Sequence, residues 1–446
     1  MILLLSLRNI HAMKRARKSE RLIASAEIDK LTGVYSKNFL FEYAGRLQKK
    51  SKGKPLDAIV VDIERFHFIN SLNGLEFGDK VLSTLGEQIR TVFRRTDNIA
   101  GRIEADRFCV FRPSKNVYQE LLHQLQSQMD ELLPNVKIRL RMGVLPGQSR
   151  VDPEEMYDRA RIACNMARSQ YDKQPLVVYD DTIRDQQYYE QRLLNDLKRA
   201  VTNEEFEVYY QPQYDIQSDP PKLKSAETLV RWRHPELGTV MPGDFVPLFE
   251  KNGVIGEVDK YVWKKAARQI AAWKEQHGTV IPVSVNLSRV DIFDPNLENE
   301  LDALLLDNHL EHGAIKLEIT ESAYTENTDQ VIVIIDRLRK KGYEIELDDF
   351  GTGYSSLGAL SAMPIDFLKM DRSFIINTHH NDTGVRMVRL ILDFAREMKI
   401  PVIAEGVEDE NELRMLKEMG CDIVQGYFFS RPLPAADFAK LLQSEQ

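Results

Sequence analysis

The segment Ile345-Glu346-Leu347-Asp348-Asp349 joins a short apolar, β-prone stretch to two carboxylates that follow it directly. The same order recurs through the second half of the chain, where amphipathic helical patterns separate the strand-like stretches. The polar residues in these positions are Glu227, Asn286, Glu318, Asp348, Asp349, Lys369 and Glu405. In a chain of alternating strands and helices, the carboxyl ends of the strands converge on one mouth of a parallel barrel. The pattern therefore predicts one polar site.

The chemistry of this predicted site follows from its charge. Several carboxylates in one barrel mouth repel one another unless a cation lies between them. Carboxylate and amide oxygens are the ligands that hard divalent metals such as Mg²⁺ and Mn²⁺ prefer. The sequence therefore indicates a metal-dependent enzyme.

The composition is that of a soluble globular protein with several domains. At 446 residues the chain is long enough for two or three domains. Its net charge of −8 does not favour binding to a nucleic-acid polymer. The cysteines, Cys109, Cys164 and Cys421, show no paired spacing. Such cysteines argue against a disulfide scaffold or a zinc site and favour the reducing cytoplasm.

Residues 1–26 form a leading segment with a composition of its own. Ile2 to Leu7 are apolar, and lysines and arginines follow as far as Arg21. The apolar part is much shorter than the roughly 20 residues that span a bilayer, and it lacks the cleavage site of a signal peptide. Two interpretations stay open. The segment is an amphipathic lead helix, or it is the end of a membrane or sensor attachment whose basic flank lies in the cytoplasm.

The rest of the chain divides by its pattern of elements. Residues 27–182 mix strand and helix signals and predict an α/β sandwich. Residues 183–192 are charged and free of Gly and Pro, which favours a semi-rigid helical connector. Residues 193–446 alternate strands and helices over about the length of a (β/α)₈ barrel. The expected fold is therefore α/β and α+β, with a barrel as the second domain.

The second half resembles the EAL domain, a family of cyclic di-GMP phosphodiesterases, from about Leu193 to Arg431. The matching pieces occur in the order of the family: Glu227-Thr228-Leu229-Val230-Arg231-Trp232, Val285-Asn286-Leu287-Ser288, Leu317-Glu318-Ile319-Thr320-Glu321-Ser322, Asp348-Asp349-Phe350-Gly351-Thr352-Gly353-Tyr354-Ser355-Ser356, Leu368-Lys369-Met370-Asp371, Ala404-Glu405-Gly406-Val407-Glu408 and Gln425-Gly426-Tyr427. The resemblance implies a (β/α)₈ barrel that hydrolyses cyclic di-GMP to linear 5'-pGpG with two Mg²⁺ or Mn²⁺ ions.

The resemblance also implies a role for each matched residue. The implied metal ligands are Glu227, Asn286, Glu318 and Asp348, with Asp349 at the second metal. Lys369 would hold the attacking water or the developing charge, and Glu405 would be a general base or a further metal ligand. Gln211 and Arg231 would contact the dinucleotide, Gln425 would support the site, and Glu321 would brace the loop from Asp349 to Ser355. Thr228 departs from the family, which has Ala there, but it removes no ligand.

The first half resembles the GGDEF domain, the diguanylate cyclase fold, from about Asp29 to Asp181. The matching pieces are Asp29-Lys30-Leu31-Thr32-Gly33, Asp62-Ile63-Glu64-Arg65-Phe66, Gly78-Asp79-Lys80-Val81-Leu82 and Gly101-Arg102-Ile103-Glu104-Ala105-Asp106-Arg107-Phe108. The last piece covers the position of the name-giving motif but reads Glu-Ala-Asp-Arg-Phe. The motif's glycines let backbone N–H groups approach phosphate, whereas Glu104 adds bulk and negative charge. Arg107 reverses the sign of a catalytic carboxylate, so cyclase activity is not expected.

Part of the nucleotide site is nevertheless present in the first half. Asp62 and Asp106 match the family's metal ligands, and Asn70 and Asp79 match its guanine contacts. One hypothesis is a domain that binds GTP without turning it over and regulates the phosphodiesterase. The other is a relic that serves as a dimerisation or linker module.

The sequence leaves one rival to the enzyme. A barrel of this family can bind cyclic di-GMP without hydrolysing it and signal through a partner protein. Such receptors usually lack metal ligands, and here every matched ligand position is filled, which favours the enzyme. A homodimer is expected from the resemblance, because EAL domains often pair through the barrel.

Overall fold

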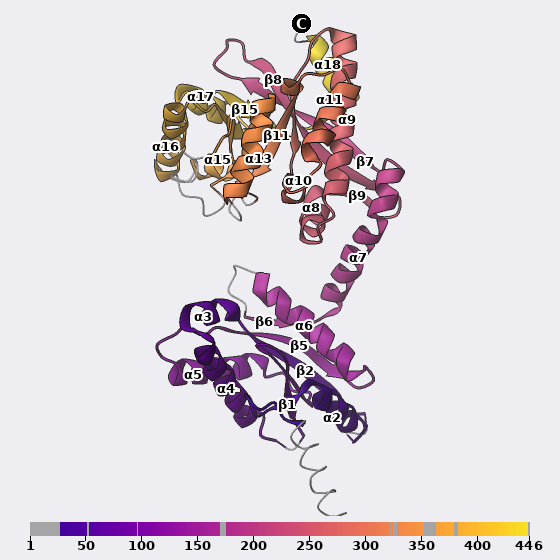
Figure 1. Cartoon of the computed structure of the whole chain (residues 1–446), viewed down its shortest axis with the longest axis vertical. Coiled ribbons are helices and arrows are strands. Elements are labelled where there is room, and N and C mark those ends of the chain that lie inside the picture. Colours follow the sequence, from indigo (N-terminus) through magenta and orange to yellow (C-terminus); the bar gives the residue numbers. More distant parts are fainter. Residues whose placement is uncertain are drawn as a thin grey trace, which may run out of the picture. The chain divides into compact units, whose positions relative to one another are not determined.

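The computed structural model describes residues 27–50, 53–95, 97–169, 175–321, 323, 328–351, 363–378 and 382–444. The leading segment 1–26 and the loop residues 352–356 therefore lie outside the described residues. The chain forms two compact units, Met1–Tyr189 and Glu190–Gln446, and Figure 1 shows both. Within the described ranges, no helix is long and apolar enough to cross a membrane.

The first unit is built on a six-stranded sheet in the order β1-β3-β4-β2-β5-β6. Its strands are β1 (Tyr35–Ser36), β2 (Leu56–Ile63), β3 (Ile99–Glu104), β4 (Arg107–Pro113), β5 (Leu140–Gln148) and β6 (Leu176–Val178). Its helices are α2 (Lys37–Lys50), α3 (Phe66–Asn73), α4 (Leu75–Val92), α5 (Tyr118–Leu132) and α6 (Pro153–Ser169). β2 lies in the sheet interior, antiparallel to β4 and β5.

Both faces of this sheet are covered by helices. Ile59 and Val61 of β2 pack in one core cluster with residues of α4 and α5. Ala58 and Val60, which point to the opposite face, pack in a second cluster with residues of α2 and α6. All eight residues of β2 are buried for this reason. The predicted cyclase-like α/β sandwich is confirmed.

The second unit closes a barrel from eight strands: β7 (Phe206–Asp215), β8 (Lys222–His234), β10 (Val283–Asn286), β11 (Ile315–Thr320), β12 (Glu344–Phe350), β13 (Phe367–Met370), β14 (Val402–Glu405) and β15 (Ile423–Gln425). β8 pairs in parallel with β10, and the strands from β10 to β15 pair in parallel in order. β7 closes the barrel by pairing with both β8 and β15. Two short strands add to this barrel: β9 (Gly238–Val240) pairs antiparallel with β8, and β16 (Leu433–Pro434) pairs antiparallel with β7.

Helices surround the barrel, and the chain enters it through α7 (Asp181–Thr202). They are α8 (Pro242–Lys251), α9 (Gly256–His277), α10 (Arg289–Ile292), α11 (Leu297–Asp307), α13 (Thr328–Lys341), α15 (Arg372–Thr378), α16 (Asp382–Met398), α17 (Glu410–Glu418) and α18 (Ala435–Ser444), with the 3₁₀ turn η1 (His312–Ala314). Alternate strand residues such as Leu317, Leu368 and Ala404 pack into the core cluster that also contains helix residues. The predicted barrel is confirmed.

The direction of the first barrel strand is a feature that strand–helix alternation did not predict. β7 runs antiparallel to β8 and to β15. Only residues 216–221 connect β7 to β8. A parallel pair needs a crossover of about a dozen residues or more, whereas a short connection produces an antiparallel hairpin. The length of this connection therefore sets the direction of β7.

Candidate active site

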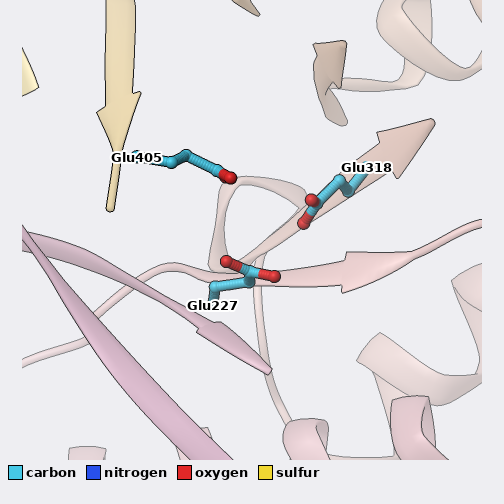
Figure 2. A group of neighbouring side chains, drawn as sticks. All are labelled: Glu227, Glu318 and Glu405. Atoms are coloured by element: carbon cyan, nitrogen blue, oxygen red, sulfur yellow. The ribbon is translucent and has the colours of Figure 1, made fainter. Parts of the chain in front are cut away.

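An acidic cluster is formed by residues of three barrel strands: Glu405 ends β14, Glu318 lies near the end of β11, and Glu227 lies in the middle of the longer β8. Glu227 of β8, Glu318 of β11 and Glu405 of β14 place carboxylate oxygens within 4.8 Å of one another. Figure 2 shows the three side chains pointing toward a common centre from separate strands. Side chains alternate along a strand, so these residues face the barrel interior while their neighbours face the helices. The sequence prediction of a convergent acidic site agrees with this geometry.

A lysine occupies the centre of this cluster. Lys369 of β13 is 1 % exposed. Its Nζ lies 2.7 Å from Glu405 Oε1, 3.2 Å from Asp348 Oδ1 and 3.4 Å from Glu227 Oε2, and it also forms an ion pair with Glu318. Burial by itself lowers the pKa of Lys369, but the surrounding carboxylates raise it well above its ordinary value. The ammonium group is therefore held in its charged form.

One ammonium group does not balance the carboxylates around it. Burial, together with Glu227 and Asp348, raises the pKa of Glu405 to about 8 even though Lys369 lowers it. Burial also raises the pKa of Glu318 well above its usual range and raises that of Glu227. Burial acts the same way on Asp348, but Lys369 and hydrogen bonds from Glu318 and the Asp349 backbone together outweigh burial and lower the pKa of that carboxyl. Burial is the main cause of the raised pKa values, and the neighbouring carboxylates add to it because four of them share one ammonium group.

The donor set fits a hard divalent cation. Glu318 is 1 % exposed, and its Oε2 atom makes no hydrogen bond to any described residue. A buried carboxylate oxygen without a donor is costly unless a cation meets it. Asn286, the register partner of Glu318, adds an exposed amide at the same mouth. Carboxylate and amide oxygens in one site are the ligands of Mg²⁺ or Mn²⁺.

A chain of buried amides supports Glu227 from inside the barrel. The Ser225 hydroxyl donates to Gln213 Oε1 at 2.5 Å, and Gln213 Nε2 donates to Gln425 Oε1 at 2.9 Å. Gln425 Nε2 then donates to Glu227 Oε2 and lies 3.3 Å from Gln211 Oε1. Each amide has its orientation set by the preceding donor, so the lone pairs of Glu227 are oriented too. Sequence reasoning identified Gln425 and Gln211 but missed Ser225 and Gln213.

The remaining residues of the predicted barrel site lie around its mouth. Arg231 is four residues beyond Glu227 on β8, and its guanidinium lies 5.9 Å from the Tyr209 ring centroid. Asp349 is exposed and adopts a left-handed φ of 55° within the register shift between Leu347 and Phe350. Such an irregularity re-aims side chains at the end of a strand. Asp349 therefore lies at an irregular position of β12, outside the regular alternation of side chains.

Two contacts involve residues next to this mouth. The Glu321 carboxylate accepts a hydrogen bond from the Gly351 N–H at 2.9 Å, at the start of the loop that it was predicted to brace. Thr228 is 3 % exposed and donates its hydroxyl to the Ser284 carbonyl of β10 at 2.8 Å. Thr228 therefore ties two strands together and leaves the cluster's carboxylates in place.

A cavity of about 320 Å³ adjoins the cluster and holds a carboxylate that sequence reasoning missed. Asn286, Thr228 and Asp259 are among its lining residues. Asp259 is 8 % exposed, and its Oδ2 makes no hydrogen bond to any described residue. Burial, with Asp291 nearby, raises its pKa well above the usual range. A signal for Asp259 was present in the sequence: it is the one acidic residue on the apolar stripe of α9 that contains Val258 and Val262.

The residues predicted for a GTP site lie in the first unit. Asp62 is the second-last residue of β2 and is buried, and Asp106 lies in the turn between β3 and β4. Asn70 of α3 packs over Gly78, where an added Cβ would lie 1.8 Å from Asn70 Oδ1. Asp79 follows on α4 and is exposed. Asn70 and Asp79 therefore lie at one end of the α3–α4 pair.

This geometry defines a class of protein: an eight-stranded barrel with an acidic cluster in its mouth. The chain belongs to the EAL domain family, whose family model matches residues 194–432. A second family model, the diguanylate cyclase GGDEF domain, matches residues 26–174. The tandem arrangement predicted from the sequence is confirmed.

Relatives of known name share this arrangement. The chain is 32 % identical over 434 residues to the cyclic di-GMP phosphodiesterase NbdA of Pseudomonas aeruginosa, covering 94 % of this chain and 54 % of that protein. It is 28 % identical to the cyclic di-GMP phosphodiesterase PdeR of Escherichia coli, covering 95 % of this chain and 64 % of PdeR. The chain thus spans about half to two thirds of the length of these relatives.

A solved structure matches the barrel. The PaMucR phosphodiesterase in complex with c-di-GMP superposes with a TM-score of 0.53 at 35 % sequence identity. The match covers 55 % of this chain and 99 % of that structure. The fold of the second unit is therefore that of a barrel solved with c-di-GMP.

We predict that divalent metal binding tightens as pH rises toward 8. In the metal-free protein Glu405 has a pKa of about 8 and carries a proton below that pH. The proton must leave before the carboxylate faces a cation, so affinity should rise about tenfold per pH unit from about pH 6 to about pH 7. Calorimetric titration of Mn²⁺ in two buffers measures the protons released. Affinity independent of pH would contradict the prediction, and Glu405→Gln should flatten the slope.

We also predict that Gln213→Leu weakens metal binding without unfolding the barrel. The change leaves the Gln425 amide free to turn its oxygen toward Glu227. Loss of support behind a metal ligand typically costs about 10–100-fold in metal affinity, which Mn²⁺ titration measures. The matched control is Gln217→Leu in the β7–β8 connection, which loses hydrogen bonds to the Cys421 and Lys417 carbonyls and none to the amide chain. Equal Mn²⁺ affinities for the two variants would contradict the prediction.

Proposed function

We propose that the barrel hydrolyses cyclic di-GMP to linear 5'-pGpG with Mg²⁺ or Mn²⁺. The observation that carries the proposal is the ring of four carboxylates around Lys369 at the mouth of an EAL barrel. Relatives named as cyclic di-GMP phosphodiesterases support the choice of substrate. Four carboxylates around one lysine leave the site with unbalanced negative charge, which supports a metal-dependent reaction.

Metal binding is assigned to the residues of the acidic mouth. Glu227, Asn286, Glu318 and Asp348 would hold a cation, and Asp349 would serve a second one. When bound, such ions neutralise the diester oxygens and make water a better nucleophile at neutral pH. The residues present fit this role because they are oxygen donors with unbalanced negative charge.

Proton transfer and charge stabilisation are assigned to two further side chains. Glu405 takes the proton of the attacking water, or alternatively completes the metal ligand set. A carboxyl group whose pKa lies near the working pH is well suited to accept a proton. Lys369 remains charged and donates hydrogen bonds to the attacking water or to the oxygen on which negative charge develops. The buried ammonium acts in a site shielded from bulk water, where its charge is more effective.

Substrate contacts are assigned to the rim of the barrel. Arg231 presents a guanidinium fork, which suits a phosphate group. Asp259 faces the adjoining cavity with an unbonded oxygen, which suits the ring N–H and amino donors of guanine. Gln211 and Gln425 are buried in the amide chain, so we assign Gln425 to support of Glu227 and keep Gln211 as the deeper contact.

The test is pGpG formation from cyclic di-GMP by the purified chain with Mg²⁺ or Mn²⁺. Glu227→Gln keeps the shape of the side chain but removes its charge. We expect activity to fall by more than about 100-fold, because loss of a residue that only supports a metal ligand typically costs about 10–100-fold. The matched control is Glu344→Gln at the opposite end of β12, where the carboxylate is 43 % exposed. The control should retain activity.

The alternative function is a receptor that binds cyclic di-GMP and signals through a partner. Tight binding of cyclic di-GMP without pGpG formation under either metal would overturn the enzyme in favour of the receptor. Hydrolysis that survives unchanged in Glu227→Gln would overturn the assignment of the site.

We propose that the first domain makes no cyclic di-GMP and regulates the barrel by binding GTP. Glu104 and Arg107 replace motif residues, while Asn70 and Asp79 retain the positions of guanine contacts. We expect no product from GTP and Mg²⁺, and a GTP-dependent change in the rate of pGpG formation. The measurement is hydrolysis with and without GTP, with Asn70→Ala as the variant that loses the effect. No binding at millimolar GTP would leave the linker or dimerisation role instead.

One proposal concerns the assembly of the chain. We propose a homodimer, which the mass of the purified chain in solution tests directly. The attachment of the chain to a membrane or a sensor concerns residues 1–26, which lie outside the described residues.

A further inference from the structure

The position corresponding to the motif of the first domain contains an arginine between two carboxylates. Arg107 begins β4, directly after the turn that follows β3. One guanidinium nitrogen lies 3.3 Å from Asp62 Oδ2, and another lies 3.4 Å from Glu104 Oε2. The Arg107 side chain is 15 % exposed and that of Asp62 is 4 % exposed. The guanidinium therefore bridges a buried carboxylate and a surface carboxylate.

Burial makes this pair more than an ordinary surface contact. A carboxylate as buried as Asp62 needs a counter-charge, since an isolated buried charge is very costly. Arg107 is always protonated and supplies that charge permanently. Contacts with Tyr157 of α6 and with Asp62 raise the pKa of Arg107 although burial by itself lowers it. Arg107 is thus held between the sheet and α6.

A second guanidinium lies beside the same strand end. Arg141 of β5 is the register partner of Asp62 and is 5 % exposed. It forms an ion pair of 3.0 Å with Glu64, two residues beyond Asp62. The carboxylates at the end of β2 are therefore each matched by an arginine. This balance differs from the acidic mouth of the barrel, where one lysine faces four carboxylates.

The residues at this strand end do not fit the divalent metal that the GGDEF family implies at Asp62 and Asp106. A divalent cation at Asp62 would lie next to the permanent positive charge of Arg107, which repels it. Among the described residues, Arg107 already pairs with Asp62 Oδ2. Asp62 Oδ1 makes no hydrogen bond to any described residue. The free oxygen shows that the carboxylate keeps capacity for a further cation once the arginine is gone.

We propose that Arg107 is a built-in counter-cation that takes the place of a divalent metal at Asp62, and that it masks a latent metal site. A phosphate ligand that enters this domain meets a guanidinium instead of a metal ion. Its binding therefore does not depend on divalent cations at this position. The proposal concerns the first domain alone and holds whether or not the barrel hydrolyses cyclic di-GMP.

The test counts bound Mn²⁺ per chain of both domains by electron paramagnetic resonance of the free ion. Every variant retains the barrel site, so differences between variants report on the first domain. We expect Arg107→Ala to bind one additional Mn²⁺, and Arg107→Ala combined with Asp62→Asn to lose it. A gain of binding is not produced by misfolding. A folded Arg107→Ala chain without the extra ion would overturn the proposal.

Two further variants keep the proposal falsifiable. Asp62→Asn alone should leave the Mn²⁺ count of the chain unchanged, and a lower count would show that the unaltered site already binds metal, which overturns the proposal. Arg112→Ala is the matched control, because Arg112 also pairs with a buried aspartate, Asp57. Asp57 keeps hydrogen bonds from the Lys115 and Gly147 N–H groups. This control should bind no additional ion, and a gain equal to that of Arg107→Ala would overturn the proposal.

Discussion

The ion-pair cluster around Lys369 is the interaction on which the second unit's chemistry depends. Two like charges about 4 Å apart repel each other by about 1 kcal/mol in bulk water and by about 4 kcal/mol near a protein surface. The barrel holds Glu227, Glu318, Asp348 and Glu405 around one ammonium group, and burial together with the neighbouring carboxylates raises the pKa of Glu405 to about 8. The strand ladders and the helix-covered core hold this arrangement in place before any cation arrives. The remaining charge imbalance is what makes the mouth a site for metal.

The two units show opposite solutions to the same electrostatic problem. In the barrel, four carboxylates share the single ammonium group of Lys369. In the first unit, Arg107 faces Asp62 and Glu104 while Arg141 faces Glu64. One site therefore retains demand for a cation, and the other meets that demand from within the chain. The difference follows from side-chain charge and burial, since both sites lie at the ends of strands in α/β folds.

Much of the architecture could be predicted because it is written in local patterns. The mixed strand and helix signals of residues 27–182 indicated an α/β sandwich, and the residues of β2 divide between core clusters on the two faces of its sheet. The polar residues after strand-like stretches indicated one barrel mouth, where Glu227, Glu318 and Glu405 lie together. The antiparallel direction of β7 was not predicted, because strand–helix alternation carries no information on strand direction where the connection is short. The roles of the individual residues stay predictions.

The sequence by itself determined the two domains, the barrel and the identity of the acidic residues at the strand ends, because periodicity and motif order are local properties of the chain. Only the tertiary structure decided which distant groups meet. Gln213 reaches Gln425 across 212 positions of sequence, and Arg107 reaches Asp62 across 45. Asp259 could be identified as a candidate site residue only from the position of α9 beside the cavity. Such contacts depend on strand register and side-chain direction, which emerge only once the sheet has closed.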